Sequence, residues 1–161
     1  MDRGDELPTT GALVWRLAMR WRAEVDRAVA PLGLTHAQYS VLASLRALTY
    51  RGERPSQRRL ADYTGLEAIY VSKLVRAVES GGLVSRVADP ADSRAVQLAL
   101  TDRGVEVIDR AISVVAALNG ELTTPLGGPD SPEIRALVRA LETLLRGNPG
   151  PDVAPDRGDD P

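Results

Sequence analysis

Apolar residues recur through most of this chain at the three- and four-residue spacing that is typical of an α-helix. The first such stretch predicts a helix from Thr10 to Ala30, which Pro31 and Gly33 end. Its apolar face carries five residues at four-residue intervals: Leu13, Leu17, Trp21, Val25 and Val29. A second helix is predicted to begin near Thr35, because Thr35 and Gln38 have the spacing of a capping box, in which each side chain satisfies a free backbone donor.

The next segment predicts two helices close together, separated by a tight turn at Gly65. Ser56 is a candidate cap for the short first helix, and the second helix is predicted from Glu67 to Ser80. Glycine suits the turn because it adopts a positive φ at little cost. The inner face of the second helix is predicted to hold four apolar residues: Val71, Leu74, Val75 and Val78.

After Gly82 the apolar period changes from that of a helix to that of a β-strand. Strands are predicted at 83–87 and 95–100, and the Pro- and Asp-containing loop between them makes a hairpin with a projecting tip. Two long helices follow, from Thr101 to about Leu122 and from about Glu133 to Arg146. The first of these is apolar on two sides, so its own domain is expected to cover one side, and a second copy of the chain is a candidate cover for the other.

This order of elements predicts a mainly α-helical fold with a small β-hairpin wing, that is, a winged helix-turn-helix with a dimerisation layer of terminal helices. We expect a flexible N-terminal tail at 1–9 and dimerisation helices at 10–34 and 101–146. The winged helix-turn-helix is expected at 35–100, and a disordered tail rich in Pro, Gly and Asp at 147–161.

Composition narrows the range of functions. The formal net charge is −2 over 161 residues, so any basic surface must be local, and the segment 54–103 holds eight basic and six acidic residues. The chain has no cysteine and one histidine, His36, so that no metal and no cofactor is expected. The chain has no apolar run long enough to span a membrane and no apolar signal-peptide core near its N-terminus, so we expect a cytoplasmic protein.

The predicted helix 67–80 has dimensions that fit the major groove of DNA. Opposite its apolar face it presents five residues: Ala68, Ile69, Ser72, Lys73 and Arg76. Three residues begin the preceding helix, where free backbone N–H groups favour a phosphate: Gln57, Arg58 and Arg59. Arg94, at the end of the hairpin tip, is a candidate for the minor groove, and Arg86 for the DNA backbone. The alternatives are an ordinary solvated face for Lys73 and Arg76, and a surface ion pair of Arg94 with Asp92.

The residues 83–86, 89–94 and 98–104 (LVSR, DPADSR and LALTDRG) resemble the wing of the MarR family of bacterial transcription regulators, and 61–66 (ADYTGL) is similar to its helix-turn-helix. The resemblance implies homodimers that bind inverted-repeat operators on double-stranded DNA, usually as repressors, and that often release DNA when a small aromatic ligand binds. It implies a minor-groove role for Arg94 and a wing-stabilising role for Asp92. The recognition-helix positions of the family correspond to Ala68, Ile69, Tyr70, Ser72 and Lys73.

Aromatic and basic residues on the first two helices indicate a candidate ligand pocket. They are Trp15, Trp21, His36, Tyr39 and Arg46. An arginine beside aromatic rings suits a small aromatic acid. The alternative is that both tryptophans pack in the dimer core and that His36 belongs only to the start of its helix.

Three classes of function are compared. The first is a homodimeric, sequence-specific DNA-binding regulator, a repressor with a small aromatic effector and a pseudo-palindromic operator. The second is a winged helix that binds other proteins and never DNA, which the acidic balance and the apolar Ile69 favour. The third is an enzyme, and the absence of cysteine, of a Gly-rich phosphate loop and of a paired-carboxylate motif argues against catalytic residues.

Overall fold

The computed structural model describes residues 8–88 and 96–146, so both predicted tails and the tip of the predicted wing fall largely outside the described residues. The chain divides into two compact units, Met1–Leu118 and Asn119–Pro161, and one long helix runs across the boundary between them. No helix in the described parts is long and apolar enough to cross a membrane.

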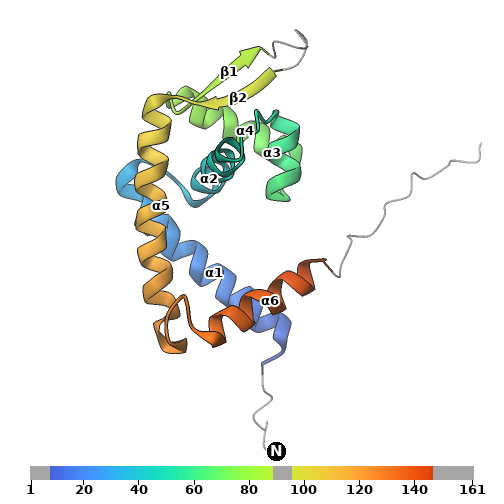
Figure 1. The fold of residues 1–161 in the computed structure, drawn as a ribbon, viewed down its shortest axis with the longest axis vertical. Helices are drawn as coiled ribbons and strands as arrows, with labels where there is room; N and C mark the ends of the chain where they lie inside the picture. Colours follow the sequence, from blue (N-terminus) through green and yellow to red (C-terminus); the bar gives the residue numbers. More distant parts are fainter. Residues whose placement is uncertain (1–7, 89–95, 147–161) are drawn as a thin grey trace, which may run out of the picture. The chain divides into compact units, whose positions relative to one another are not determined.

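The first unit contains the predicted helices and the predicted hairpin (Figure 1). Its elements are α1 (Thr10–Val29), the 3-10 turn η1 (Ala30–Leu32), α2 (His36–Tyr50), α3 (Gln57–Thr64), α4 (Ala68–Ser80), β1 (Val84–Ala88), β2 (Val96–Leu100) and most of α5 (Asp102–Thr123). The mainly helical fold with one antiparallel hairpin is therefore confirmed, and each element begins and ends close to its predicted bounds.

Local capping explains where these helices begin. The capping box predicted at α2 is present: the Thr35 hydroxyl accepts from the Gln38 amide and the Gln38 side chain accepts from the Thr35 amide. Ser56 accepts from the Arg59 amide at the start of α3. Gly65 ends α3 with φ of 67°, the left-handed conformation that the predicted turn requires.

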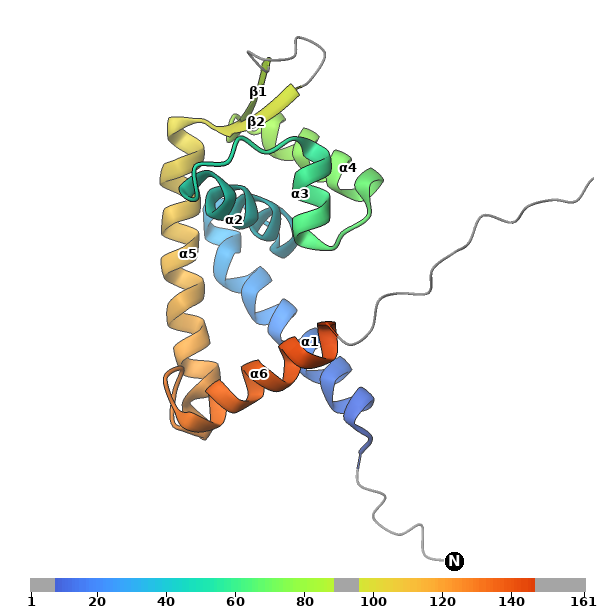
Figure 2. The ribbon, with the colours of Figure 1, turned by 45° about the vertical axis from the view of Figure 1, so that its right-hand side comes forward.

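Helix α2 lies at the centre of the unit, between α5 on one side and α3 and α4 on the other (Figures 1 and 2). Its side chains Val41, Leu42, Leu45 and Leu48 are almost completely buried. The inner face of α4 contributes the predicted Val71, Leu74, Val75 and Val78 to the same core. A contiguous apolar core of this kind is the main source of stability in a domain of this size.

The apolar stripe of α1 is buried over only part of its length. Val25 and Val29 belong to the core, whereas Leu13 and Leu17 expose about half of their surface, 49% and 47%. The predicted stripe is therefore real, but the N-terminal half of α1 has no covering element within its own unit.

The hairpin is anchored at its base to the helix-turn-helix. Strands β1 and β2 pair from Val84–Leu100 to Ala88–Val96, and Figure 2 shows them beside α3 and α4. The amide of Leu98 donates to the carbonyl of Pro55, directly before α3. The sequence predicts that Val96, Leu98 and Leu100 of β2 alternate inward. Leu98 is buried, whereas Val96 is exposed and Leu100 is half-buried, so burial follows the predicted alternation only in part.

Thr101 joins α4, the hairpin and α5. Its hydroxyl donates to the carbonyl of Gly82 at 2.7 Å and accepts from the amide of Gly104 at 2.9 Å, so it caps α5 as predicted. Helix α5 approaches the Leu83 backbone so closely here that a Cβ on Gly104 would lie 1.9 Å from the Leu83 carbonyl oxygen. Only glycine fits at position 104 without moving α5.

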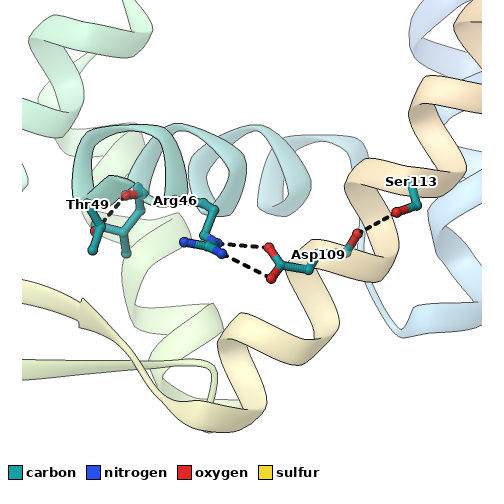
Figure 3. A network of polar contacts seen from close by, with 5 residues as sticks. Arg46, Thr49, Asp109 and Ser113 are labelled. Carbon is teal, nitrogen blue, oxygen red and sulfur yellow. Dashed lines mark hydrogen bonds and ion pairs between the residues drawn. The ribbon is translucent and has the colours of Figure 1, made fainter. Parts of the chain in front are cut away.

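A bidentate ion pair joins α2 to α5 (Figure 3). The Arg46 guanidinium donates to both carboxylate oxygens of Asp109, at 2.8 and 3.1 Å. Ser113, one turn later, donates to the backbone carbonyl of Asp109. The hydrogen bond from Arg46 lowers the pKa of Asp109 below its usual value near 3.8.

The second unit contains the end of α5, the 3-10 turn η2 (Thr124–Leu126) and α6 (Pro132–Arg146). The Ser131 hydroxyl caps α6 by accepting from the Ile134 amide. Helix α6 is strongly amphipathic, yet none of its residues is buried, and Leu144 and Leu145 expose 61% and 81% of their surface. Its apolar face therefore has no cover within this chain's second unit.

The replacement Gly104→Ala tests the close approach of α5 to Leu83. We expect it to lower the free energy of unfolding by at least about 1–3 kcal/mol, because the new methyl group overlaps a backbone oxygen. Gly120→Ala is the matched control on the same helix: nothing lies within 4 Å of its Cβ position, and it should stabilise the protein by about 0.5–1 kcal/mol. Urea unfolding of both variants measures the difference, and equal effects would contradict the contact.

The Arg46–Asp109 pair makes stability depend on pH. Because the pKa of Asp109 is lower in the folded state, its stabilisation is present above about pH 3.8 and is lost as the pH falls through the folded-state value. Asp109→Asn should therefore lower the unfolding midpoint near neutral pH, and its difference from the wild type should shrink in acid. Glu106→Gln, an exposed neighbour on α5 without an ion pair among the described residues, is the control. A difference that persists unchanged below pH 3 would refute the assignment.

Candidate nucleic-acid interface

Helices α3 and α4 form the helix-turn-helix, and their inner faces fix how α4 is rotated. Leu60 and Ala61 of α3 are buried against the core that also holds Val71 and Leu74 of α4. Because the inner face of α4 is buried in this core, the opposite face of the helix points outward. The rotation of α4 thus decides which of its side chains are available to a partner.

The outward stripe of α4 consists of Ile69, Lys73 and Arg76. At about 100° of rotation per residue, these three lie within roughly 60° of one another and opposite the buried residues. All three are exposed, and Ile69 exposes 67% of its surface. Ser72 is half-buried on one flank of the stripe, and Ala68 is exposed at the first turn. The predicted outward face is therefore present.

The two cations of this stripe have no acidic partner in the part of the chain that the structure describes. Among the described residues, no carboxylate lies within ion-pair distance of Lys73 or Arg76, and the Arg76 side chain only donates to the backbone carbonyl of Ser72 at 3.4 Å. Arg58, exposed in the first turn of α3, also has no ion pair in this part of the chain. Unpaired cations on one exposed surface are the local feature that a phosphate backbone attracts.

Two other predicted contacts have partners within the chain. Arg59 makes a bidentate ion pair with Glu53, at 2.9 and 3.2 Å, and its guanidinium lies 5.7 Å from the ring of Tyr63. The hydrogen bond from Glu53 raises the pKa of Arg59. Arg86 of β1 donates to Glu79 of α4 at 3.0 Å. These ion pairs distinguish Arg59 and Arg86 from Lys73 and Arg58, which have no ion pair among the described residues.

The remaining predicted contacts are placed as follows. Gln57 is half-buried in the first turn of α3, and the ring of Tyr70 is partly exposed, at 43%, on the flank of α4 that faces α2. Asp92 and Arg94, the wing residues, lie outside the described residues.

A cavity of about 410 Å³ lies beside α4 within the first unit. Its lining comes from α1, α2, the end of α3 and the start of α4: Arg22, His36, Ala37, Ser40, Ser44, Tyr63, Thr64, Leu66 and Tyr70. Burial lowers the pKa of His36, an effect that the Asp26 carboxylate opposes and the Arg22 charge reinforces. The cavity thus combines a cation, an imidazole, several hydroxyl groups and two aromatic rings.

The five residues predicted to share one ligand pocket do not line one cavity. Of these five, only His36 lines the 410 Å³ cavity. Trp15 is 66% exposed on α1 and lines a shallow surface hollow of that helix, whereas Trp21 and Tyr39 pack against the core. Arg46 is held by Asp109 on the α5 side of α2.

The cation of the cavity is Arg22, which the sequence analysis missed. Arg22 is next to Trp21, so it lies on the neighbouring face of α1, and the reversal at Pro31–Gly33 returns His36 to that face. The pairing of Arg46 with Asp109, 63 positions later, was not visible in the local pattern. Among the described residues that line the cavity, Arg22 is the arginine, and no ion pair is found for it in this part of the chain.

Comparisons with known proteins agree with this architecture. Residues 34–104 match the family model described as a winged helix DNA-binding domain. YdcH, an uncharacterized HTH-type transcriptional regulator of Bacillus subtilis (strain 168), is 33% identical over 109 residues, which are 68% of this chain and 74% of YdcH.

Several solved structures share the fold. The transcriptional repressor CouR bound to a 23-mer DNA duplex is 31% identical, with a TM-score of 0.77 over 91% of this chain and 99% of that chain. CouR from Rhodococcus jostii RHA1 bound to p-coumaroyl-CoA is 29% identical, with a TM-score of 0.71 over 91% and 94%. A MarR-family regulator from Rhodococcus sp. RHA1 is 29% identical, with a TM-score of 0.72 over 86% and 93%. This chain belongs to the MarR family of winged helix-turn-helix DNA-binding transcriptional regulators.

Proposed function

We propose that this protein is a cytoplasmic homodimeric repressor that binds a pseudo-palindromic operator and is released by a small aromatic acid. The observation that carries the proposal is the outward stripe of α4, where Lys73 and Arg76 are exposed and lack carboxylate partners in the described chain. A cationic stripe on the second helix of a helix-turn-helix is suited to the major groove. Arg58 contacts phosphate at the start of α3, and Arg94 of the wing enters the minor groove.

Uncovered apolar surface supports the dimer. In the first unit, Leu13 and Leu17 of α1 and Ile112 and Val114 of α5 are exposed, although each belongs to an apolar face. In the second unit, four apolar residues of α6 are exposed: Leu137, Val138, Leu144 and Leu145. Exposed apolar surface on several helices marks a protein interface. A two-fold dimer covers it and doubles the small cationic stripe of one subunit. Residues 10–34 and 101–146 supply this layer, and 35–100 contact DNA.

The dimer sets the form of the operator. Two copies of α4 related by a two-fold axis read two half-sites whose centres lie about one helical turn, roughly 10 bp, apart. The sequence of the half-sites is therefore an inverted repeat.

The cavity beside α4 supports a ligand response. Arg22 supplies a charge for a carboxylate, and the rings of Tyr63 and Tyr70 supply apolar contacts for an aromatic group. CouR, a relative of similar fold, binds p-coumaroyl-CoA. Because Tyr70 is part of α4, a ligand bound in the cavity contacts α4 directly, and it acts by favouring a dimer in which the two copies of α4 no longer match the half-site spacing.

A protein-binding winged helix is the second candidate function, favoured by the acidic overall charge balance and by the exposed Ile69.

Binding to duplex DNA distinguishes the two candidate functions. Selection of duplexes from a random pool by the full chain, followed by binding across a salt series, should yield an inverted repeat whose affinity falls steeply with salt. Sedimentation of the same sample should give the mass of a dimer. A monomer, or no selected sequence even at low salt, overturns the regulator proposal in favour of the protein-binding one.

The stripe of α4 predicts the effect of Lys73→Ala. If Lys73 contacts a base edge, its loss should weaken operator binding by about 1–3 kcal/mol per half-site and relax the preference at one position. Arg110→Ala on α5 removes an exposed arginine without an ion pair among the described residues and is the matched control. Fluorescence anisotropy with the selected duplex measures both variants, and equal affinities for Lys73→Ala and the wild type would exclude Lys73 from the interface.

The cavity predicts the effect of Arg22→Ala on ligand binding. Benzoate, the simplest aromatic carboxylate, should raise the thermal midpoint of the wild type because it binds the folded state. It should also weaken operator binding, because it favours the dimer that does not match the half-site spacing. Both effects should be lost in Arg22→Ala, whereas Arg46→Ala should keep them, since Arg46 is on the α5 side of α2. Loss of the benzoate response in Arg46→Ala, with Arg22→Ala unaffected, would reverse the assignment.

A further inference from the structure

Ile69 is a large apolar side chain that the other described residues leave mostly exposed. It lies in the first turn of α4 and exposes 67% of its surface. The residues of α4 that pack in the core are on the opposite, inner face of the helix. A single exposed apolar residue is common on protein surfaces and needs no special explanation. Ile69 differs because it lies in the same stripe as Lys73 and Arg76, the two cations without carboxylate partners in the described chain.

The position of Ile69 within the stripe limits what it can contact. With a rise of about 1.5 Å per residue, Ile69 lies roughly 6 Å along the helix axis from Lys73 and roughly 10 Å from Arg76. These separations are about two and three base-pair steps of 3.4 Å. When the stripe enters a major groove, Ile69 therefore lies within reach of base edges in the same groove.

Tyr70, the next residue along α4, points in a different direction from Ile69. Its ring lines the cavity beside α2, on the flank of α4, so it is not part of the stripe. Ile69 is therefore the apolar group that the stripe presents to a partner.

We propose that Ile69 reads the 5-methyl group of a thymine in each operator half-site, about two base pairs from a guanine read by Lys73. This inference rests on the proposed function. Thymine is the base that carries an apolar group in the major groove, and lysine pairs with the acceptors of guanine. The isoleucine side chain has no hydrogen-bonding atom, so an amino or carbonyl edge buried against it would lose its water without a replacement. The same side chain thus favours thymine and disfavours cytosine at that position.

The test uses the duplex that the full chain selects from a random pool. Thymines of each half-site are replaced one at a time by uracil, which keeps the base pair and removes only the 5-methyl group. At one position per half-site we expect wild-type affinity to fall about fourfold, and about fifteenfold when both half-sites are changed. Thymines that flank the half-sites are the matched control and should show no effect.

Variants at position 69 assign the effect to Ile69. In Ile69→Ala the same uracil replacement should change affinity by less than about twofold, because the contact is already lost. Ile69→Leu, which keeps an apolar side chain of the same size, should retain sensitivity to uracil. The salt dependence of Ile69→Ala should match the wild type, since no charge is removed, and its thermal midpoint should be unchanged because the side chain is exposed.

The outcomes separate this inference from the proposed function. Tight, salt-dependent binding in which no thymine of the half-site responds to uracil overturns the role of Ile69 and leaves the regulator intact. An equal response to uracil in the wild type and in Ile69→Ala shows that another group contacts the methyl, and this also overturns the inference. Failure to select any duplex overturns both.

Discussion

Burial of α2 is the constraint on which the first unit depends. Val41, Leu42, Leu45 and Leu48 each expose 1% or less of their surface, so neighbouring elements must cover this helix along its length. Burial of side chains of this size contributes about 1.5–3 kcal/mol each before the entropy of ordering is subtracted. Helices α3 and α4 cover one side of α2, and in doing so they turn Val71, Leu74, Val75 and Val78 inward. The outward direction of Ile69, Lys73 and Arg76 is thus a consequence of packing around α2.

The distribution of ion pairs explains how an acidic chain presents a cationic surface. Arg46, Arg59 and Arg86 each face a carboxylate, so these charges are largely neutralised locally. Lys73 and Arg76 have no such partner among the described residues, so their charge remains available although the chain as a whole carries −2. Local pairing therefore decides which part of the surface attracts a phosphate backbone, and the net charge does not.

Much of the fold could be predicted from the sequence because its signals are local. The capping box at Thr35, the cap at Ser56 and the left-handed Gly65 depend on residues within four positions of one another, and the structure places all three as expected. The outward face of α4 follows from the helical period alone. The cavity could not be predicted in this way, because its lining combines Arg22, His36 and Tyr63 from three helices. Arg46 was predicted for a ligand pocket because it lies near aromatic residues of the first two helices, and its pairing with Asp109, 63 positions later, has no signal in that local pattern.

The cavity and the outward stripe lie on two different sides of α4, and this bears on the proposed regulation. Tyr70 lines the cavity and Ile69, the preceding residue, points to the outward stripe. Adjacent helical residues differ by about 100° in direction and share one rigid backbone, so that they move together. In the proposed regulation, a ligand that shifts the backbone of α4 at Tyr70 would therefore also change the direction of Ile69 and Lys73 without unfolding any element. Because base contacts depend on short distances, a small rotation of α4 would be sufficient to weaken recognition of one half-site. In the proposed two-fold dimer the same rotation occurs in both subunits, so recognition of both half-sites would weaken together.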